Sequence, residues 1–217
     1  MRAIVGMMQN NMKIIGITGG VGSGKSKVLC ELKNTYHAFV VEADKVAHEL
    51  MLPGGTIYAS VIKNFGNEII DPKPPYNIDR TKLGNIVFND QAKLELLNSL
   101  THPLVKEFIV NLINVHKNNN STKLFVIEAA LLIEAGYKEI CDEIWYIWVN
   151  KEERIKRLMN SRGYSREKCI SIFNNQKEDE FYKKYANCTI NNQYSFEDTS
   201  NQLKDLLNKL YNNDIIS

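Results

Sequence analysis

The chain has 217 residues, of which 44% are hydrophobic and 24% are charged, and its formal net charge is +2. This length fits one domain, or one domain with small insertions, and the apolar content is sufficient for a substantial core. The nearly neutral charge gives no indication of a nucleic-acid partner, and no apolar run approaches the length of a membrane-spanning helix. We therefore expect neither nucleic acid nor a membrane as a partner.

Cysteine usage and the N-terminus indicate the compartment. The cysteines, Cys30, Cys141, Cys169 and Cys188, are far apart and form no C-x-x-C pair. This spacing supports neither a zinc site nor a redox motif, and reduced thiols are typical of a cytoplasmic protein. Residues 1–11 form an extension before a natural start at Met12; they are too few for a normal signal peptide, and they leave an organellar location open.

The first predicted elements are a strand, a glycine-rich loop and a helix. A buried strand over Ile14–Thr18 is followed by Gly19-Gly20-Val21-Gly22-Ser23-Gly24-Lys25-Ser26 and then by a helix over Lys27–Tyr36. The loop fits G-x-x-x-x-G-K-[ST], the P-loop pattern. Its glycines allow successive backbone N–H groups to point into one concave space, and the helix N-terminus attracts phosphate. The sequence therefore predicts a nucleoside triphosphate site.

The residue types of the loop have separate chemical roles. Lys25 can reach the β- and γ-phosphates, and the hydroxyl of Ser26 can coordinate Mg²⁺. The expected nucleotide-binding residues are Gly20, Val21, Gly22, Ser23, Gly24, Lys25, Ser26 and Lys27.

Strands and helices alternate along the rest of the chain, which predicts an α/β fold with a parallel sheet covered by helices. Apolar, β-rich runs such as Leu124–Ile127 suit a sheet that is buried on both faces. The expected strands are Ile14–Thr18, Ala38–Val41, Leu124–Glu128, Glu143–Val149 and Cys188–Ile190.

A long helical insertion is expected between the second and third strands. Asp71–Pro75 reads as a rigid surface turn, Asp90 as the N-cap of one helix and Pro103 as the first residue of another. The insertion is where a second substrate would bind, or else it is a helical elaboration without a ligand.

A second helical pair is expected after the fourth strand. Lys151–Ser161 is a basic helix that Gly163 ends, and Ser165 can cap the next helix. Small P-loop kinases often have a mobile, arginine-bearing lid at this point. An amphipathic helix over Ser195–Tyr211 closes the chain and is most simply explained by core packing.

Asp44 is a candidate catalytic residue because it lies just after the second strand. Ligands of open α/β sheets bind beyond the carboxyl ends of the strands. A carboxylate there could accept the proton of a hydroxyl that attacks the γ-phosphate. Alternatively, Asp44 is only the N-cap of a helix over Lys45–Met51.

Other candidates also have structural alternatives. Glu128 ends an apolar strand and could hold a water molecule on Mg²⁺, or it is an ordinary strand-end carboxylate. Arg157 and Arg162 could neutralise phosphate charge, or they are solvated arginines of a surface helix. His102 precedes Pro103 and could contact a ligand, although a lone histidine is more often a packed or capping residue.

Two alternative nucleotide-binding classes lack their motifs in this sequence. There is no G-x-G-x-x-G, which argues against a dinucleotide-binding Rossmann enzyme. There is also no Asn-Lys-x-Asp motif, which weakens a GTPase interpretation.

Taken together, these segments resemble the dephospho-CoA kinase family from about Met12 to Leu207, and the order of the motifs makes the resemblance specific. Besides the P-loop, the matching segments are Glu42–His48 (D-A-D-x-[IV]-A-[RH]), Pro53–Gly55 with Phe65-Gly66, Asp79–Phe88 (D-R-x-x-L-G…V-F), Leu100–Pro103 (I-T-H-P), Leu131–Gly136 (P-L-L-F-E-x-G), Arg157–Arg162 (R-L-x-x-R), Gln176 and Ala186–Asn191 (A-D-x-x-I-x-N).

The resemblance implies a P-loop NTPase fold, with a five-stranded parallel sheet, a helical acceptor-binding insertion and a helical lid. One kinase domain would span residues 12–217. Its parts would be a core of about 12–50, 122–150 and 186–217, the insertion of about 52–118 and the lid of about 151–186.

The resemblance also implies the activity: transfer of the ATP γ-phosphoryl group to the ribose 3′-hydroxyl of dephospho-CoA, with Mg²⁺, as the last step of coenzyme A synthesis. Asp44 would be the general base, and Lys25, Arg157 and Arg162 would stabilise charge on the transferring group. Asp44, Arg80 and His102 would contact the acceptor, and Ser26 and Glu128 the metal, Glu128 through water. The partners would be the two small-molecule substrates, and the protein a monomer or small homo-oligomer.

The sequence departs from the family pattern at several positions. Glu42 replaces the first acid of D-A-D, Lys27 follows the P-loop where threonine is common, and Ala130 replaces a proline. Ile172 stands where many members have an arginine, and Arg157 and Arg162 are one residue further apart than in R-L-x-x-R.

Two other functions stay open at this point. Another small-molecule P-loop kinase, such as one for nucleoside monophosphates, would have a similar architecture. A nucleotide-binding regulator without transferase activity would keep the P-loop, although an acid at position 44 favours an enzyme.

Overall fold

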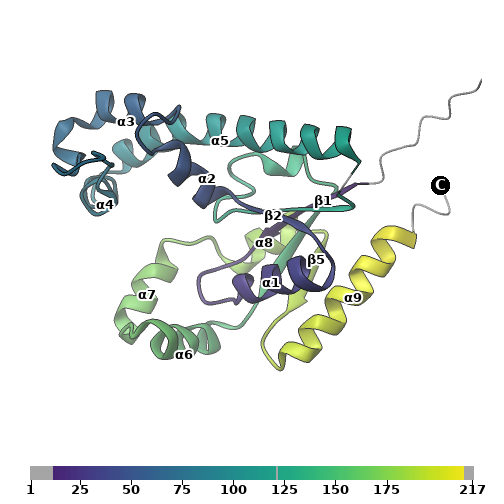
Figure 1. Cartoon of the computed structure of the whole chain (residues 1–217). Coiled ribbons are helices and arrows are strands. Elements are labelled where there is room, and N and C mark those ends of the chain that lie inside the picture. Colours follow the sequence, from purple (N-terminus) through teal and green to yellow (C-terminus); the bar gives the residue numbers. More distant parts are fainter. Residues whose placement is uncertain (1–11, 121, 213–217) are drawn as a thin grey trace, which may run out of the picture. The chain divides into compact units, whose positions relative to one another are not determined.

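The computed structural model describes residues 12–120 and 122–212, which fold as two compact units (Figure 1). The helical unit is Val41–Asn119, and the core unit comprises the described residues on either side of it. The N-terminal extension, residues 1–11, lies outside the described residues.

A five-stranded parallel sheet forms the centre of the core unit, in the order β2-β3-β1-β4-β5. All of the expected strands are present, with ends that differ from the predicted ones by at most one residue. Their bounds are β1 (Lys13–Thr18), β2 (Phe39–Glu42), β3 (Leu124–Glu128), β4 (Glu143–Trp148) and β5 (Cys188–Asn191). The central strands β1, β3 and β4 are mostly buried, which explains why their segments are largely apolar, whereas the edge strands β2 and β5 are only partly buried.

The helices α1 (Lys25–Thr35) and α9 (Phe196–Asn212) lie against one face of this sheet (Figure 1). Leu32 of α1 and Leu203 of α9 are fully buried in one cluster with Ile15, Ile17 and Trp145 of the strands. The apolar stripe of the closing helix is therefore core packing, as predicted. Because α1 is fixed to the sheet in this way, the loop before it has a rigid support.

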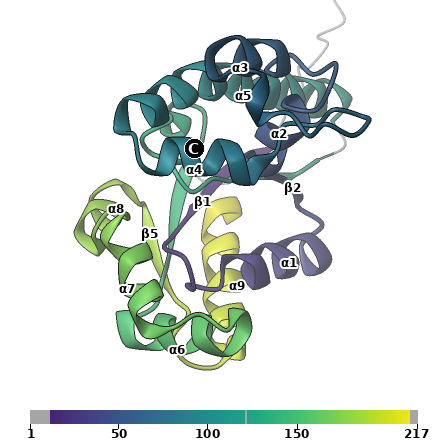
Figure 2. The same ribbon diagram turned by 90° about the vertical axis from the view of Figure 1, so that its left-hand side faces the viewer.

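Three further helices of the core unit follow β4 in the chain: α6 (Lys151–Arg162), α7 (Arg166–Asn174) and α8 (Asp179–Tyr185). Figure 2 shows α6 and α7 as a neighbouring pair. Gly163 ends α6 with a left-handed φ of 64°, and the Ser165 hydroxyl accepts a hydrogen bond from the Lys168 amide at 3.2 Å, so both predicted boundaries are confirmed. A short 3-10 helix, η2 (Tyr137–Glu139), precedes β4.

The helical unit contains α2 (Ala43–Leu50), α3 (Tyr58–Phe65), the 3-10 helix η1 (Asn67–Ile69), α4 (Arg80–Phe88) and α5 (Gln91–Asn119). The Asp90 carboxylate accepts a hydrogen bond from the Lys93 amide at 3.1 Å, as expected for the N-cap of the long helix. The prediction that Pro103 opens a new helix was wrong, because α5 runs through it. A proline inside a helix removes one backbone hydrogen bond, and burial of Val105, Ile109 and Ile113 after it keeps the segment helical.

Within the described part of the chain, no helix combines the length and the apolar character that crossing a membrane requires.

The burial of the cysteines makes their relative reactivity a test of the fold. Burial raises the pKa of the Cys141 and Cys188 thiols to about 12, and Cys169 is fully buried, whereas Cys30 is exposed. Because the thiolate is the reactive form, a higher pKa means less thiolate at pH 8 and slower reaction. We expect a disulfide reagent at pH 8 to modify Cys30 first, and the other thiols only on unfolding. Rapid modification of more than one thiol in the native protein would contradict this packing.

Candidate active site

The glycine-rich loop connects β1 to α1 and has the backbone geometry of an anion-binding nest. Gly22 and Gly24 have φ angles of 83° and 86°, which side chains of L-residues rarely adopt. Gly24 is the N-cap of α1, and no side chain caps the helix there. The first N–H groups of α1 are therefore available for a ligand, and the helix dipole favours an anion at this place.

Lys25 and Glu128 bring opposite charges to this loop. The Lys25 ammonium donates to the carbonyl oxygen of Gly19 at 2.8 Å and lies 3.6 Å from a carboxylate oxygen of Glu128. Glu128 ends β3 and is paired in register with Ile17 of β1, immediately before the loop. The two side chains are 16% and 11% exposed, so this ion pair lies in a weakly solvated place.

The oxygen groups present fit a magnesium ion that is completed by phosphate. Ser26 is the second residue of α1 and is exposed, and Glu128 supplies a carboxylate at the neighbouring strand end. The described residues contain no cluster of three or more metal-binding side chains. Mg²⁺ commonly takes only one or two protein ligands beside phosphate oxygens and water, so this sparse set is what a nucleotide-bound magnesium needs.

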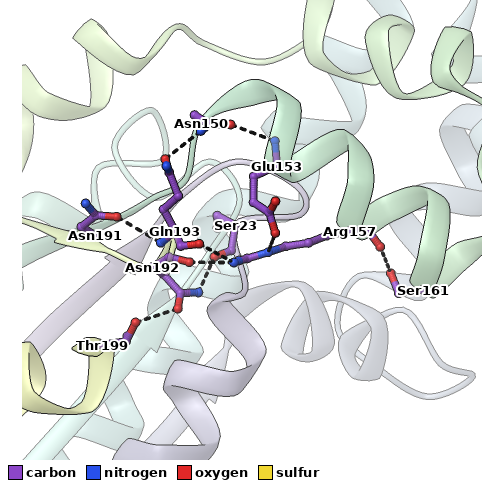
Figure 3. A network of polar contacts seen from close by, with 9 residues as sticks. All are labelled: Ser23, Asn150, Glu153, Arg157, Ser161, Asn191, Asn192, Gln193 and Thr199. Atoms are coloured by element: carbon purple, nitrogen blue, oxygen red, sulfur yellow. Dashed lines mark hydrogen bonds and ion pairs between the residues drawn. The ribbon is translucent and has the colours of Figure 1, made fainter. Parts of the chain in front are cut away.

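A polar network fixes the loop to the end of β5 (Figure 3). The Asn192 amide nitrogen donates to the carbonyl oxygen of Ser23 at 2.7 Å, and its amide oxygen accepts from the Thr199 hydroxyl at 2.8 Å. Arg157 donates to the carbonyl oxygen of Asn192 at 2.9 Å and pairs with Glu153 at 3.1 Å. Asn192 is 5% exposed, and its side-chain nitrogen and oxygen are both hydrogen-bonded, so it holds the loop in place.

A second set of contacts joins the loop to α6 and to the turn after α7. The Arg154 Nε donates to the carbonyl oxygen of Val21 at 2.8 Å, and its Nη2 donates to the Gln176 amide oxygen at 2.5 Å. The same Gln176 oxygen accepts from the Val21 amide at 3.3 Å. The Arg154 guanidinium also lies over the ring of Phe173, 4.1 Å from its centroid. Gly20 and Val21 thus have an arginine and a glutamine directly beside them.

The predicted acceptor residues lie in the helical unit. Arg80 lines a cavity of about 580 Å³ together with His48, Asp79 and apolar residues that include Leu83 and Leu97. Asp79 caps α4 by accepting from the amides of Thr81 and Lys82. His102 lies within α5, is half-buried and does not line this cavity.

Asp44 is the second residue of α2, which begins directly after β2, and its side chain is exposed. The alternative that Asp44 is a helix N-cap was wrong, because the N-cap residue is Glu42 and Asp44 already has a place in the first turn. The helix starts earlier than expected because Ala43 and Val46 are buried and anchor its first turn.

The comparisons with known proteins agree with one another. Residues 13–198 match the family model described as dephospho-CoA kinase. A dephospho-CoA kinase of Dehalococcoides mccartyi is 39% identical over 86% of this chain and 92% of the relative. One of Carboxydothermus hydrogenoformans is 38% identical over 91% of this chain and 94% of the relative.

The chain belongs to the dephospho-CoA kinase family.

Solved structures support the same fold for this family member. A Thermus thermophilus protein of known structure superimposes with a TM-score of 0.76 and 28% identity, covering 92% of this chain and 98% of its own. The dephospho-CoA kinase of Campylobacter jejuni gives a TM-score of 0.67 at 24% identity, covering 93% and 98%. A shikimate kinase of Acinetobacter baumannii, with a TM-score of 0.53 at 14% identity, shares the fold alone.

The structure groups only part of the predicted site around the P-loop. Lys25, Ser26 and Glu128 meet there, and Arg157 reaches the loop through Asn192. Arg162 lies at the end of α6 over the ring of Tyr164, 5.9 Å from its centroid, and Lys27 lies over the ring of Phe196, 4.1 Å from its centroid. Neither contact involves the loop.

Arg154 and Asn192 of this family member were not among the residues that the sequence led us to expect at the loop. Asn192 follows the last strand in the run Asn191-Asn192-Gln193, and polar residues at a strand end are a usable signal. Arg154 precedes Arg157 by one helical turn, so the two lie on one side of α6. Arg162 lies about 140° around the helix from Arg157, a difference that the sequence spacing already contains.

Proposed function

We propose that the protein transfers the γ-phosphoryl group of ATP to the ribose 3′-hydroxyl of dephospho-CoA and releases ADP and coenzyme A. The observation that carries this proposal is the P-loop nest with Lys25 and Glu128 beside it, in a chain that belongs to the dephospho-CoA kinase family. Such a nest favours the phosphates of a nucleoside triphosphate, and the family supplies the acceptor.

In the proposed reaction, a bond forms between the acceptor 3′-oxygen and the γ-phosphorus while the bond from that phosphorus to the β–γ bridging oxygen breaks. The electron pair of the broken bond stays on ADP, and the proton of the hydroxyl passes to Asp44. The P-loop amides and Lys25 hold the β- and γ-phosphates, and Lys25 leaves the Glu128 carboxylate for them.

Ser26 and Glu128 would hold Mg²⁺, Ser26 directly and Glu128 through water. When bound, the ion would neutralise charge on the β- and γ-phosphate oxygens.

The remaining predicted residues have separate parts in the proposal. Arg80 lines the cavity of the helical unit, where its guanidinium can bind an anionic part of the acceptor, and His102 is a second proposed acceptor contact. Arg157 binds at the end of β5 beside the loop and would support the nucleotide there. Arg162 would reach phosphate only through a movement of the lid.

The test is ADP release with dephospho-CoA as the only acceptor. We expect turnover with dephospho-CoA and little with AMP, UMP or no acceptor. Phosphorylation of a nucleoside monophosphate in place of dephospho-CoA would favour the other kinase interpretation. ATP binding without any transfer would favour a nucleotide-binding regulator.

A further inference from the structure

Arg154 lies directly on the P-loop. Its Nε donates to the carbonyl oxygen of Val21, 133 residues away in the chain, at 2.8 Å. A Cβ atom added to Gly20 would collide with its guanidinium group, so the guanidinium lies against the backbone of Gly20. Gly20 and Val21 open the loop whose amides form the predicted phosphate nest.

Three neighbours hold the guanidinium in this position. The Gln176 amide oxygen accepts from Nη2 at 2.5 Å and from the Val21 amide at 3.3 Å, so one atom bridges the arginine and the loop. The guanidinium lies over the Phe173 ring, with the Arg154 Cζ atom 4.1 Å from the ring centroid. An arginine held by a stacked ring and two acceptors is already ordered for binding an anion.

No carboxylate pairs directly with Arg154 in the described part of the chain. Its hydrogen-bond acceptors are a backbone carbonyl and a side-chain amide, and none of the ion pairs in the described part of the chain includes Arg154. The negative charge of the Asp179 carboxylate favours the charged form of Arg154, and this carboxylate accepts hydrogen bonds from Tyr146 and Trp148 at 2.7 and 2.6 Å. Burial lowers the pKa of the Arg154 guanidinium, since a charge is costly in a weakly solvated place.

Each of the other arginines of α6 differs from Arg154 in at least one respect. Arg157 pairs with Glu153 and donates to the carbonyl oxygens of Asn192 and Gln193. Arg162 lies over Tyr164 at the far end of the helix. Within α6, Arg154 alone combines a direct contact with the loop and a half-buried charge that lacks an ion pair.

We propose that Arg154 binds the terminal phosphate of the nucleoside triphosphate in the P-loop and stabilises the charge of the transferring phosphoryl group. The anion would take the place of the Gln176 oxygen at the Val21 amide, and the forked guanidinium would donate to it. The inference rests on the proposed phosphoryl transfer and adds to it a catalytic residue on the lid.

Ile172 offers a second position from which an arginine could reach the same place. It lies in α7 and packs, together with Val21, against the cluster of Ile155, Leu158, Cys169 and Phe173. It is also the position at which the sequence departs from the arginine that many members of the family have. In this chain, Arg154 of α6 would therefore supply the charge that Ile172 of α7 does not.

The experiment compares Arg154→Gln and Arg154→Lys with Arg166→Gln, whose arginine is exposed and pairs with Glu152 at 2.8 Å. The rate is measured with ATP and dephospho-CoA, and the affinities for ATP and for ADP are measured separately by calorimetry. We expect Arg154→Gln to lower kcat by a factor on the order of 10²–10³. Its affinity for ATP should fall about tenfold more than its affinity for ADP, because ADP lacks the terminal phosphate. Arg166→Gln should behave like the parent.

The lysine variant separates charge from packing. Lysine keeps the positive charge but lacks the planar guanidinium that can donate two parallel hydrogen bonds. Arg154→Lys should therefore retain more activity, and more of the preference for ATP over ADP, than Arg154→Gln. A parental kcat in Arg154→Gln, or an equal loss of ATP and ADP affinity in both variants, would overturn the proposal and leave Arg154 as a structural contact. If Arg154→Gln does not fold, the proposal is tested with Arg154→Lys alone. A greater loss of affinity for ATP than for ADP in that variant supports it, and an equal loss overturns it.

The two proposals fail in different ways. If the parent releases no ADP with dephospho-CoA, the proposed function fails, but the ATP and ADP affinities still test whether Arg154 binds the terminal phosphate. If the parent turns over and Arg154→Gln does as well, only the role of Arg154 fails.

Discussion

Replacement of Asp44 by asparagine should lower kcat by roughly 10²–10⁴, the scale for loss of a general base. Asparagine keeps the shape of the side chain but cannot take up the proton of the attacking hydroxyl at neutral pH. Affinity for ATP should change little, because the P-loop residues are untouched. The measurement is ADP release with dephospho-CoA, with ATP affinity determined on the same preparation.

Stability should distinguish catalysis from a structural role for Asp44. The side chain is exposed in the first turn of α2 and is not the N-cap. Loss of its charge near the helix N-terminus should cost about 0.3–1 kcal/mol of unfolding free energy, far less than the expected loss in rate. Glu49→Gln, an exposed change on the same helix, is the control and should have the parental kcat. An Asp44→Asn protein with parental turnover would require another base.

Lys25→Ala should lower kcat by a factor on the order of 10²–10³. The lysine ammonium lies at the P-loop between the carbonyl oxygen of Gly19 and the carboxylate of Glu128. We propose that the ammonium moves from these two groups to the β- and γ-phosphates when the nucleotide binds. There it would counter the negative charge of the phosphoryl group during its transfer. Turnover with saturating ATP and dephospho-CoA measures the effect.

Lys25→Ala should also lower stability, since it removes the ammonium beside a Glu128 side chain that is only 11% exposed. The expected loss is about 1–3 kcal/mol of unfolding free energy, which chemical denaturation can measure. Lys33→Ala, an exposed change in the last turn of the same helix, serves as the control. Near-parental turnover of a folded Lys25→Ala protein would remove Lys25 from the mechanism.

Most of the fold could be predicted because the signals are local. A continuous run of apolar, β-branched or aromatic residues, such as Leu124–Ile127, predicts a strand buried on both faces without any information from the rest of the chain. The P-loop is equally local, since Gly22 and Gly24 adopt positive φ angles that glycine, but few other residues, can adopt. Pro103 is the exception: its preference for a helix start is also local, but burial of Val105, Ile109 and Ile113 outweighs it.

From the sequence alone, the nucleotide site, the family resemblance and the roles of Lys25 and Ser26 within the loop could be predicted. Which distant side chains contact that loop follows only from the packing of the folded chain. Arg154, Gln176 and Asn192 reach it from 133, 155 and 169 residues away. Helical spacing places positions 154 and 162 on different sides of α6, but it does not say which side faces the loop. Their difference arises because the packing of α6 against the loop turns one guanidinium toward Val21 and leaves the other over Tyr164.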